Sequence, residues 1–299
     1  MNKTPLDQRG VGHIVMIVGI VVVAVIGLAG YRVLTNKKTA STDNKQAETS
    51  QASTATAWST DSTITWEATG QGSWISLPYD AKVPACPDPL QLELPTTDIS
   101  KATSLLYPGQ TRSGTFEGKG GNYKPHGGFR FDKNADNTIA VVMPFNGSVF
   151  RGNRVLVDGE IQYSFDIANA CGMMIRLGHL RDLTPEFQAI ADKFAPATEG
   201  DSRTTKVTPL VPFKTGDKIA TAVGFRNTKN VGFDYGVYNL REDNEASKDA
   251  AYKAAHADTA ELSFHALCWL DLLNPKDKNA VKALPAADQL SGKKSDYCK

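Results

Sequence analysis

The most constraining feature of this sequence is an uncharged apolar stretch close to the N-terminus. Between Gly10 and Tyr31 the chain contains "IVMIVGIVVVAVIGLAG" and no charged residue. As a helix, this stretch would be about 33 Å long, whereas the hydrocarbon core of a bilayer is about 30 Å thick. The sequence therefore predicts a cytoplasmic stub and a single transmembrane anchor in residues 1–34, with membrane contact through residues 11–31.

A cleaved signal peptide is the alternative interpretation of the same stretch. Lys3 and Arg9 would form the basic start of such a peptide, and "GLA" before Gly30 is an acceptable cleavage site. The apolar run is longer than the apolar segment of a usual signal peptide, which favours a retained anchor.

Residues 35–57 have the composition of a spacer. Their sequence, "TNKKTASTDNKQAETSQASTATA", contains no apolar side chain larger than alanine. Such a segment cannot bury enough surface to offset its ordering entropy. We therefore expect a disordered linker here.

The four cysteines, Cys86, Cys171, Cys268 and Cys298, all follow the apolar stretch, and none forms a C-x-x-C pair. An even number of cysteines favours disulfides and an oxidising compartment, although reduced core cysteines are the alternative. We expect Cys268 to pair with Cys298, as a staple for the C-terminal tail, and Cys86 with Cys171. This interpretation predicts a single-pass protein of the cell membrane with most of its chain extracytoplasmic.

The charge of the chain excludes one class of partner. The formal net charge is +1, whereas nucleic-acid-binding proteins usually concentrate an excess of lysine and arginine on one face. We expect no nucleic-acid partner.

Short runs typical of β-strands follow the spacer. Examples are "STITWEAT", "SWISLPY", "LQLELP", "TIAVVMPFNGSVFRG", "NRVLVDGEIQYSFDIA", "GMMIRLGHL" and "KIATAVGFR". The dipeptides Asn146-Gly147 and Asp158-Gly159 favour tight hairpins, because both positions of such turns need positive φ. We expect a β-rich N-terminal region over residues 58–122 and a mostly antiparallel β domain over residues 123–243.

Two stretches favour helices instead. One is Thr184 to Ala195, with Pro185 in its first turn, and the other is the alanine-rich stretch after Glu245, which Asn274-Pro275 should stop. The fold class is therefore predicted to be mainly β with helical additions, with a helical, disulfide-closed C-terminal extension over residues 244–299.

The middle of the chain contains a series of motifs in a specific order. The series is "HGGFR" from His126, "PFNGSV" from Pro144, "LGHL" around His179, "KTGDKIATAVG" from Lys214 and finally "GFDYGVYNL". From about Tyr123 to Leu240 this series resembles the lysostaphin-type zinc endopeptidases of cell-wall metabolism. The resemblance implies their antiparallel β fold, zinc as a cofactor, and a catalytic role for His179.

The chain departs from that family at the positions of the metal ligands. The family motif H-x-G-x-D has Arg130 in place of its aspartate, and the final H-x-H strand contains Asp234 but no histidine. Arginine is a permanent cation and cannot ligate zinc. Asp132 lies on the same strand face as His126, about 6 to 7 Å beyond the usual ligand position.

Two interpretations of this site remain open. If zinc is retained, its ligands would be His126, Asp132 and Asp234, because a catalytic zinc needs three protein ligands and an open position. Alternatively, Arg130 replaces the charge of the metal and forms an ion pair with Asp132 and Asp234. We favour the ion pair, because arginine and zinc would otherwise place two cations in one cleft.

These observations predict a cell-envelope protein with a degenerate peptidase-like domain. Its expected role is a non-catalytic binding or regulatory module without a cofactor, whose partner is a peptidoglycan peptide or an envelope hydrolase. One alternative is an active zinc endopeptidase that cleaves peptidoglycan peptides. Another is a structural assembly protein that acts through its C-terminal extension. Because these functions are inferred from a fold, they are hypotheses.

Overall fold

The computed structural model of the protein describes residues 57–112, 122–134 and 136–299. These residues belong to one compact unit, Thr54–Lys299. In the part of the chain that is described, no helix is both long enough and apolar enough to cross a membrane. The predicted fold class, which included a transmembrane helix, is corrected accordingly: this part is mainly β with short helices. The stretch 11–31 that prompted the prediction, and nearly all of the linker predicted over 35–57, lie outside the described residues.

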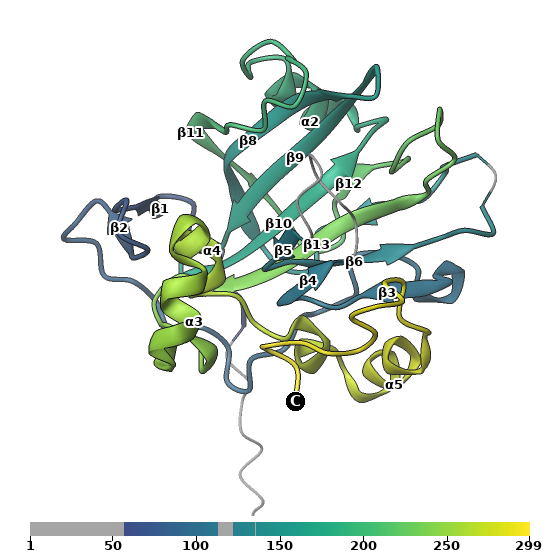
Figure 1. The fold of residues 1–299 in the computed structure, drawn as a ribbon. Coiled ribbons are helices and arrows are strands. Elements are labelled where there is room, and N and C mark those ends of the chain that lie inside the picture. The colour runs from purple at the N-terminus through teal and green to yellow at the C-terminus, as the bar shows by residue number, and fades with distance from the viewer. Residues whose placement is uncertain (1–56, 113–121, 135) are drawn as a thin grey trace, which may run out of the picture. The chain divides into compact units, whose positions relative to one another are not determined.

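Seven antiparallel strands form the main sheet (Figure 1). In spatial order they are β11 (Thr205–Phe213), β8 (Gly147–Val157), β9 (Glu160–Ala168), β10 (Met173–Leu180), β13 (Gly232–Asn239), β6 (Gly127–Arg130) and β3 (Ser104–Leu106). Three two-stranded sheets flank it: β1 (Thr65–Ala68) with β2 (Trp74–Leu77), β4 (Gln110–Arg112) with β5 (Asn122–Lys124), and β7 (Val141–Val142) with β12 (Lys218–Ala220).

Side chains along the central strands point alternately to the two faces of the sheet. One face packs in the main core, and the other carries the candidate site. On β13, Phe233, Tyr235 and Val237 are buried in the main core, where they join side chains of β9 and β10. Because successive strand residues point to opposite faces, Asp234, Gly236 and Tyr238 face the other side of the sheet. The functional side chains considered below lie on this second face.

One of the two predicted hairpin turns is confirmed. Asp158 and Gly159 connect β8 to β9 with φ of 51° and 75°, as the tight turn requires. The other prediction is wrong, because Asn146-Gly147 leads into β8 without joining two paired strands. Instead, the Asn146 side chain accepts hydrogen bonds from Thr215, so this residue links two loops.

The proline-containing strand β11 was not predicted, and one predicted strand is absent. Proline has no backbone N–H to donate to a neighbouring strand. Pro209 and Pro212 fit β11 because this strand is at the edge of the sheet and pairs with a neighbour on one side only. The stretch "LQLELP", residues 90–95, forms no strand. Its Leu92 is buried in the main core, and the Leu92 N–H donates to the Leu272 carbonyl.

The helices are shorter than predicted, and those of the C-terminal part are differently placed. The first, α2 (Pro185–Ala191), begins at Pro185 as expected. The alanine-rich stretch is broken into α3 (Ala250–Ala255), α4 (Ala260–Ser263) and 3-10 turns. At Asn274-Pro275 a helix starts rather than stops: the Asn274 side chain accepts the Asp277 N–H and caps α5 (Pro275–Ala283).

The C-terminal extension is an integral layer of the unit. Trp269 is fully buried in the main core, with its ring centroid 5.1 Å from that of Phe129 and 5.0 Å from that of Tyr235. Leu270 and Val281 are also fully buried there. Truncation after Leu240 would therefore remove part of the core itself.

Both predicted disulfides are confirmed. Cys86 is bonded to Cys171 and Cys268 to Cys298, and no cysteine is free. The second bond attaches the C-terminal tail to the core, as expected. Because disulfides persist in oxidising compartments, the two bonds indicate an extracytoplasmic environment.

Candidate functional site

The candidate site is centred on Asp234, in the middle of the second sheet face. Asp234 pairs with Gly178 of β10 on one side and with Gly128 of β6 on the other. Because neither glycine has a side chain, the two residues paired with Asp234 place no side chain beside its carboxylate. A Cβ on Gly178 would lie 3.4 Å from the Asp234 Cβ, in ordinary contact with it.

Three basic side chains contact the Asp234 carboxylate. Arg112, at the end of β4, places Nη1 3.3 Å from Oδ1. His126, directly before β6, has Nε2 3.1 Å from Oδ2, and His179 of β10 has Nε2 3.3 Å from the same oxygen. Four segments that are distant in the sequence therefore meet at one carboxylate.

A β-bulge turns His179 toward this carboxylate. Along β10, Leu177 pairs with Phe165 and Leu180 with Tyr163, so β10 contains one residue more than β9 between these pairs. His179 is left in a left-handed conformation with φ of 59°, which is uncommon for a residue other than glycine. Strict alternation would place His179 on the same face as buried Leu177. The bulge instead gives it contact with Asp234 and 36% side-chain exposure.

Burial and charge determine the ionisation of the site. Burial would raise the pKa of Asp234, but the contacts with His126 and His179 outweigh it and hold the pKa well below its usual value. Burial lowers the pKa of His126, an effect that Asp234 only partly offsets. The Asp234 carboxylate is thus ionised at neutral pH, beside a His126 imidazole that resists protonation.

Lys124 adds a fourth basic group. Burial lowers its pKa, while Asp234 raises it and Arg112 lowers it further. The cluster formed by Arg112, Lys124, His126, His179 and Asp234, called here the Asp234 cluster, thus contains four basic side chains and one acid. The acid is already in contact with three of the basic groups.

The structure brings together only part of the residue set that the sequence predicted. His126, His179 and Asp234 meet, whereas Asp132 accepts hydrogen bonds from Thr103 and Arg130 at the end of β6. Arg130 is 2.8 Å from Asp132, but its predicted pairing with Asp234 is not among the contacts of the described residues. The arginine on Asp234 is Arg112 instead.

Sequence analysis missed Arg112 and Lys124. Arg112 belongs to a strand of only three residues, which is too short to show periodicity. Lys124 lies two residues before the motif histidine, but an isolated lysine is not a distinctive signal. Their place in the site follows from the β4–β5 pairing, in which Arg112 is opposite Asn122.

The structure brings together only two of the three predicted zinc ligands, His126 and Asp234. Two imidazoles and a carboxylate are zinc-type donors, but Asp132 is bound elsewhere and Arg112 already contacts Asp234. Within the described residues, no group of three histidine, cysteine or acidic side chains is arranged to hold a metal ion. We therefore assign no metal-dependent step to this site.

The lowered pKa of His126 predicts a pH effect on stability. As pH falls below the ordinary value of 6.5, the unfolded chain takes up a proton that folded His126 does not, so the free energy of unfolding should decrease. One proton limits the slope to about 1.4 kcal/mol per pH unit. Urea unfolding at several pH values between 7.5 and 5 measures this change in the free energy of unfolding.

The control for this experiment is a His126→Gln variant. It should have a smaller slope than the wild type, while any contribution from His256, whose pKa is also lowered by burial, stays the same in both proteins. Equal slopes would show that His126 is protonated as easily in the folded chain as in the unfolded one. Asp234 acts at lower pH: its stabilising contribution is lost as the carboxylate is protonated, below about pH 4.

No protein-family model, curated protein or solved structure matches this chain. The resemblance to lysostaphin-type peptidases therefore rests on the sequence motifs alone.

Proposed function

We propose that the protein is a non-catalytic binding module of the cell envelope, and that the Asp234 cluster binds a carboxylate group of its ligand. The observation behind this proposal is the excess of basic groups over a single acid that is already engaged. The carboxylate of a ligand would bind beside Lys124 and the partly exposed His179. Charge-assisted hydrogen bonds to a carboxylate are among the stronger polar contacts in proteins.

The extracytoplasmic environment and the motif series narrow the ligand class. A peptide with free carboxylates, such as a peptidoglycan stem peptide, fits both. A regulatory contact with an envelope hydrolase would use the same groups if the partner presents an acidic chain end. The alternative role in assembly through the C-terminal extension has less support, because that extension is packed into the core.

Calorimetric titration of the full-length protein with a stem tetrapeptide tests the proposal. The tetrapeptide should bind, and its amidated counterpart should bind at least about tenfold more weakly, a difference of about 1.4 kcal/mol. A Lys124→Met variant should lose a similar factor for the free acid only. Lys133→Met, at an exposed lysine close to β6, is the matched control and should bind like the wild type.

Two results would contradict this function. Equal affinity for the acid and the amide would show that the carboxylate is not recognised. Cleavage of the peptide, accompanied by about one equivalent of zinc that is lost in a His126→Ala variant, would establish the endopeptidase alternative instead.

A further inference from the structure

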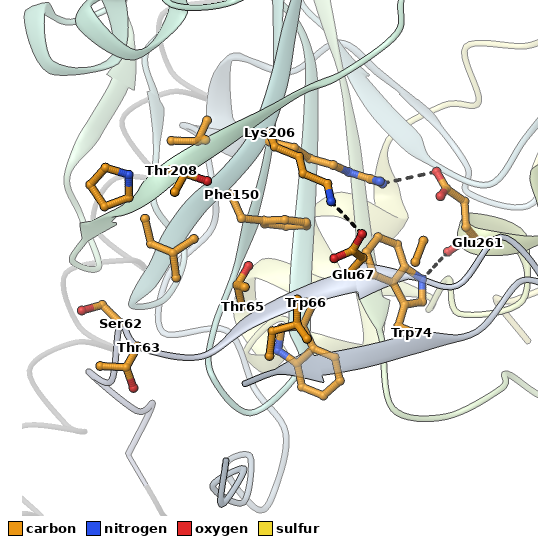
Figure 2. Close-up of a pocket in the computed structure, with 16 residues that line it drawn as sticks. Ser62, Thr63, Thr65, Trp66, Glu67, Trp74, Phe150, Lys206, Thr208 and Glu261 are labelled. Carbon is orange, nitrogen blue, oxygen red and sulfur yellow. Dashed lines mark hydrogen bonds and ion pairs between the residues drawn. The ribbon is translucent and has the colours of Figure 1, made fainter. Parts of the chain in front are cut away.

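A cavity of about 660 Å³ lies apart from the Asp234 cluster, between the β1–β2 hairpin and the edge strand β11 (Figure 2). Phe150 and Arg151 of β8 and Glu261 of α4 complete its walls. This volume is in the range of pockets that bind small molecules, about 300 to 1,000 Å³. No residue that lines it belongs to the Asp234 cluster, so the inference below does not depend on the proposed function.

Aromatic side chains form one part of the apolar lining, beside aliphatic residues of β1, β2 and β11. Trp66, Trp74 and Phe150 all line it, and the Trp74 and Phe150 rings meet edge to face with centroids 6.2 Å apart. The Trp74 Nε1–H donates to the Glu261 carbonyl at 2.8 Å, which fixes the indole ring. The Arg151 guanidinium lies 4.8 Å from the Trp74 ring centroid and 5.6 Å from that of Phe150. The aromatic wall is thus held in place before a ligand arrives.

The charges of the cavity are balanced. Lys206 Nζ is 2.6 Å from Glu67 Oε1, and Arg151 Nη2 is 3.3 Å from Glu261 Oε1. Figure 2 shows Lys206 with Glu67, and Glu261 beside Trp74. With two cations paired to two anions, the cavity offers no net charge to attract an ion. A neutral ligand suits it better than a charged one.

The same groups retain hydrogen-bonding capacity. A carboxylate can accept about four hydrogen bonds and a lysine can donate three, more than these pairs use. The hydroxyl groups of Ser62, Thr65 and Thr208 add donors and acceptors. The Thr63 hydroxyl, which donates to Asp61, adds an acceptor. Between Lys206 and Val211 the pairing of β11 with β8 is interrupted, so the intervening backbone groups, which also line the cavity, take no part in that ladder.

We propose that this cavity binds a neutral oligosaccharide of two or three rings. The C–H groups of a sugar would contact the exposed parts of the aromatic rings and the aliphatic side chains of Leu77 and Leu210, which also line the cavity. The hydroxyl groups of the sugar both donate and accept hydrogen bonds. They can therefore donate to the paired carboxylates, accept from the lysine, and do either with the threonines. A peptide would supply fewer hydroxyl groups for these polar side chains, and an ionic ligand would gain little from charges that are already paired.

Titrations of the full-length protein with three neutral trisaccharides test this inference. The probes are the trimer of N-acetylglucosamine, cellotriose and maltotriose, with tryptophan fluorescence and calorimetry as readouts. At least one should bind saturably and change the emission, because Trp66 and Trp74 line the cavity. Glu67→Gln should weaken that binding at least tenfold, since it removes a charged acceptor and the partner of Lys206.

Glu245→Gln is the matched control. Glu245 forms an exposed ion pair of the same length, 2.6 Å, with Lys248, and neither residue lines the cavity. This variant should bind the sugar like the wild type, and both variants should retain the wild-type circular dichroism spectrum. Absence of saturable binding by all three trisaccharides would overturn the inference. So would unchanged affinity in Glu67→Gln, or binding of a tripeptide in place of the sugars.

Discussion

Removal of the disulfide between Cys86 and Cys171 is expected to lower the free energy of unfolding by about 4.5 kcal/mol. The two residues are 85 positions apart, so the bond closes a long loop in the unfolded chain and strongly limits its conformational entropy. In the folded chain it connects the segment before β3 to the turn between β9 and β10. Urea unfolding of a Cys86→Ala/Cys171→Ala double variant measures the loss.

The second disulfide provides an internal comparison. Cys268 and Cys298 are separated by 30 positions, for which the same loop-closure argument gives about 3.5 kcal/mol. We therefore expect the Cys268→Ala/Cys298→Ala variant to be the more stable of the two. The reverse order would show that packing or residual structure in the unfolded chain, rather than loop length, determines the contribution of these bonds.

Replacing Asp166 by asparagine should have an effect of similar size, about 3 to 5 kcal/mol. The Asp166 side chain is 1% exposed and bridges two arginines: it is bonded to Arg151 and lies 2.8 Å from the Arg176 Nε. Loss of its charge leaves the Arg176 guanidinium without this counter-ion and leaves Arg151 with Glu261, which is 40% exposed. A buried charge that loses its partner is very unfavourable. Denaturant unfolding at pH 7 gives the difference from the wild type.

Asp132→Asn is the matched control for this variant. Asp132 also pairs with an arginine on the same sheet, at 2.8 Å, but its side chain is 50% exposed. Exposed pairs of this kind contribute about 0 to 1 kcal/mol. If the two variants lose equal stability, burial of the Asp166 pair is not what makes it important.

Local sequence signals predicted the centre of the sheet well. The alternating runs between residues 147 and 180 became β8, β9 and β10, and Asp158-Gly159 forms the turn between the first two. These elements pair with their neighbours in the chain, so short-range pattern and turn chemistry suffice to define them. For β11 they did not suffice, because its prolines argue against a central strand while its edge position accepts them.

In the alanine-rich C-terminal stretch, local sequence signals predicted a longer helix than the structure contains. Its composition favours a long helix, but the consecutive residues Cys268, Trp269 and Leu270 are all buried, and a single straight helix presents only one face to a core. The Cys268–Cys298 bond also fixes the position of this segment. Packing requirements from distant residues therefore outweighed the local preference.

Sequence alone determined the chemical character of the site. It identified His126, His179 and Asp234 as related positions and excluded Arg130 as a ligand, since these statements need only residue types and their order. Strand alternation also placed Asp132 on the same strand face as His126.

Only the tertiary structure decided which groups meet there. Arg130 and Arg112 are both arginines close to the same strand, and nothing local distinguishes them as partners for Asp234. The β4–β5 pairing places Arg112 on the carboxylate, while Thr103 and Arg130 hold Asp132 at the end of β6. The bulge before Leu180 turns His179 toward the other oxygen of the Asp234 carboxylate. Contacts of this kind depend on long-range strand register, which one residue more or less in a strand changes completely.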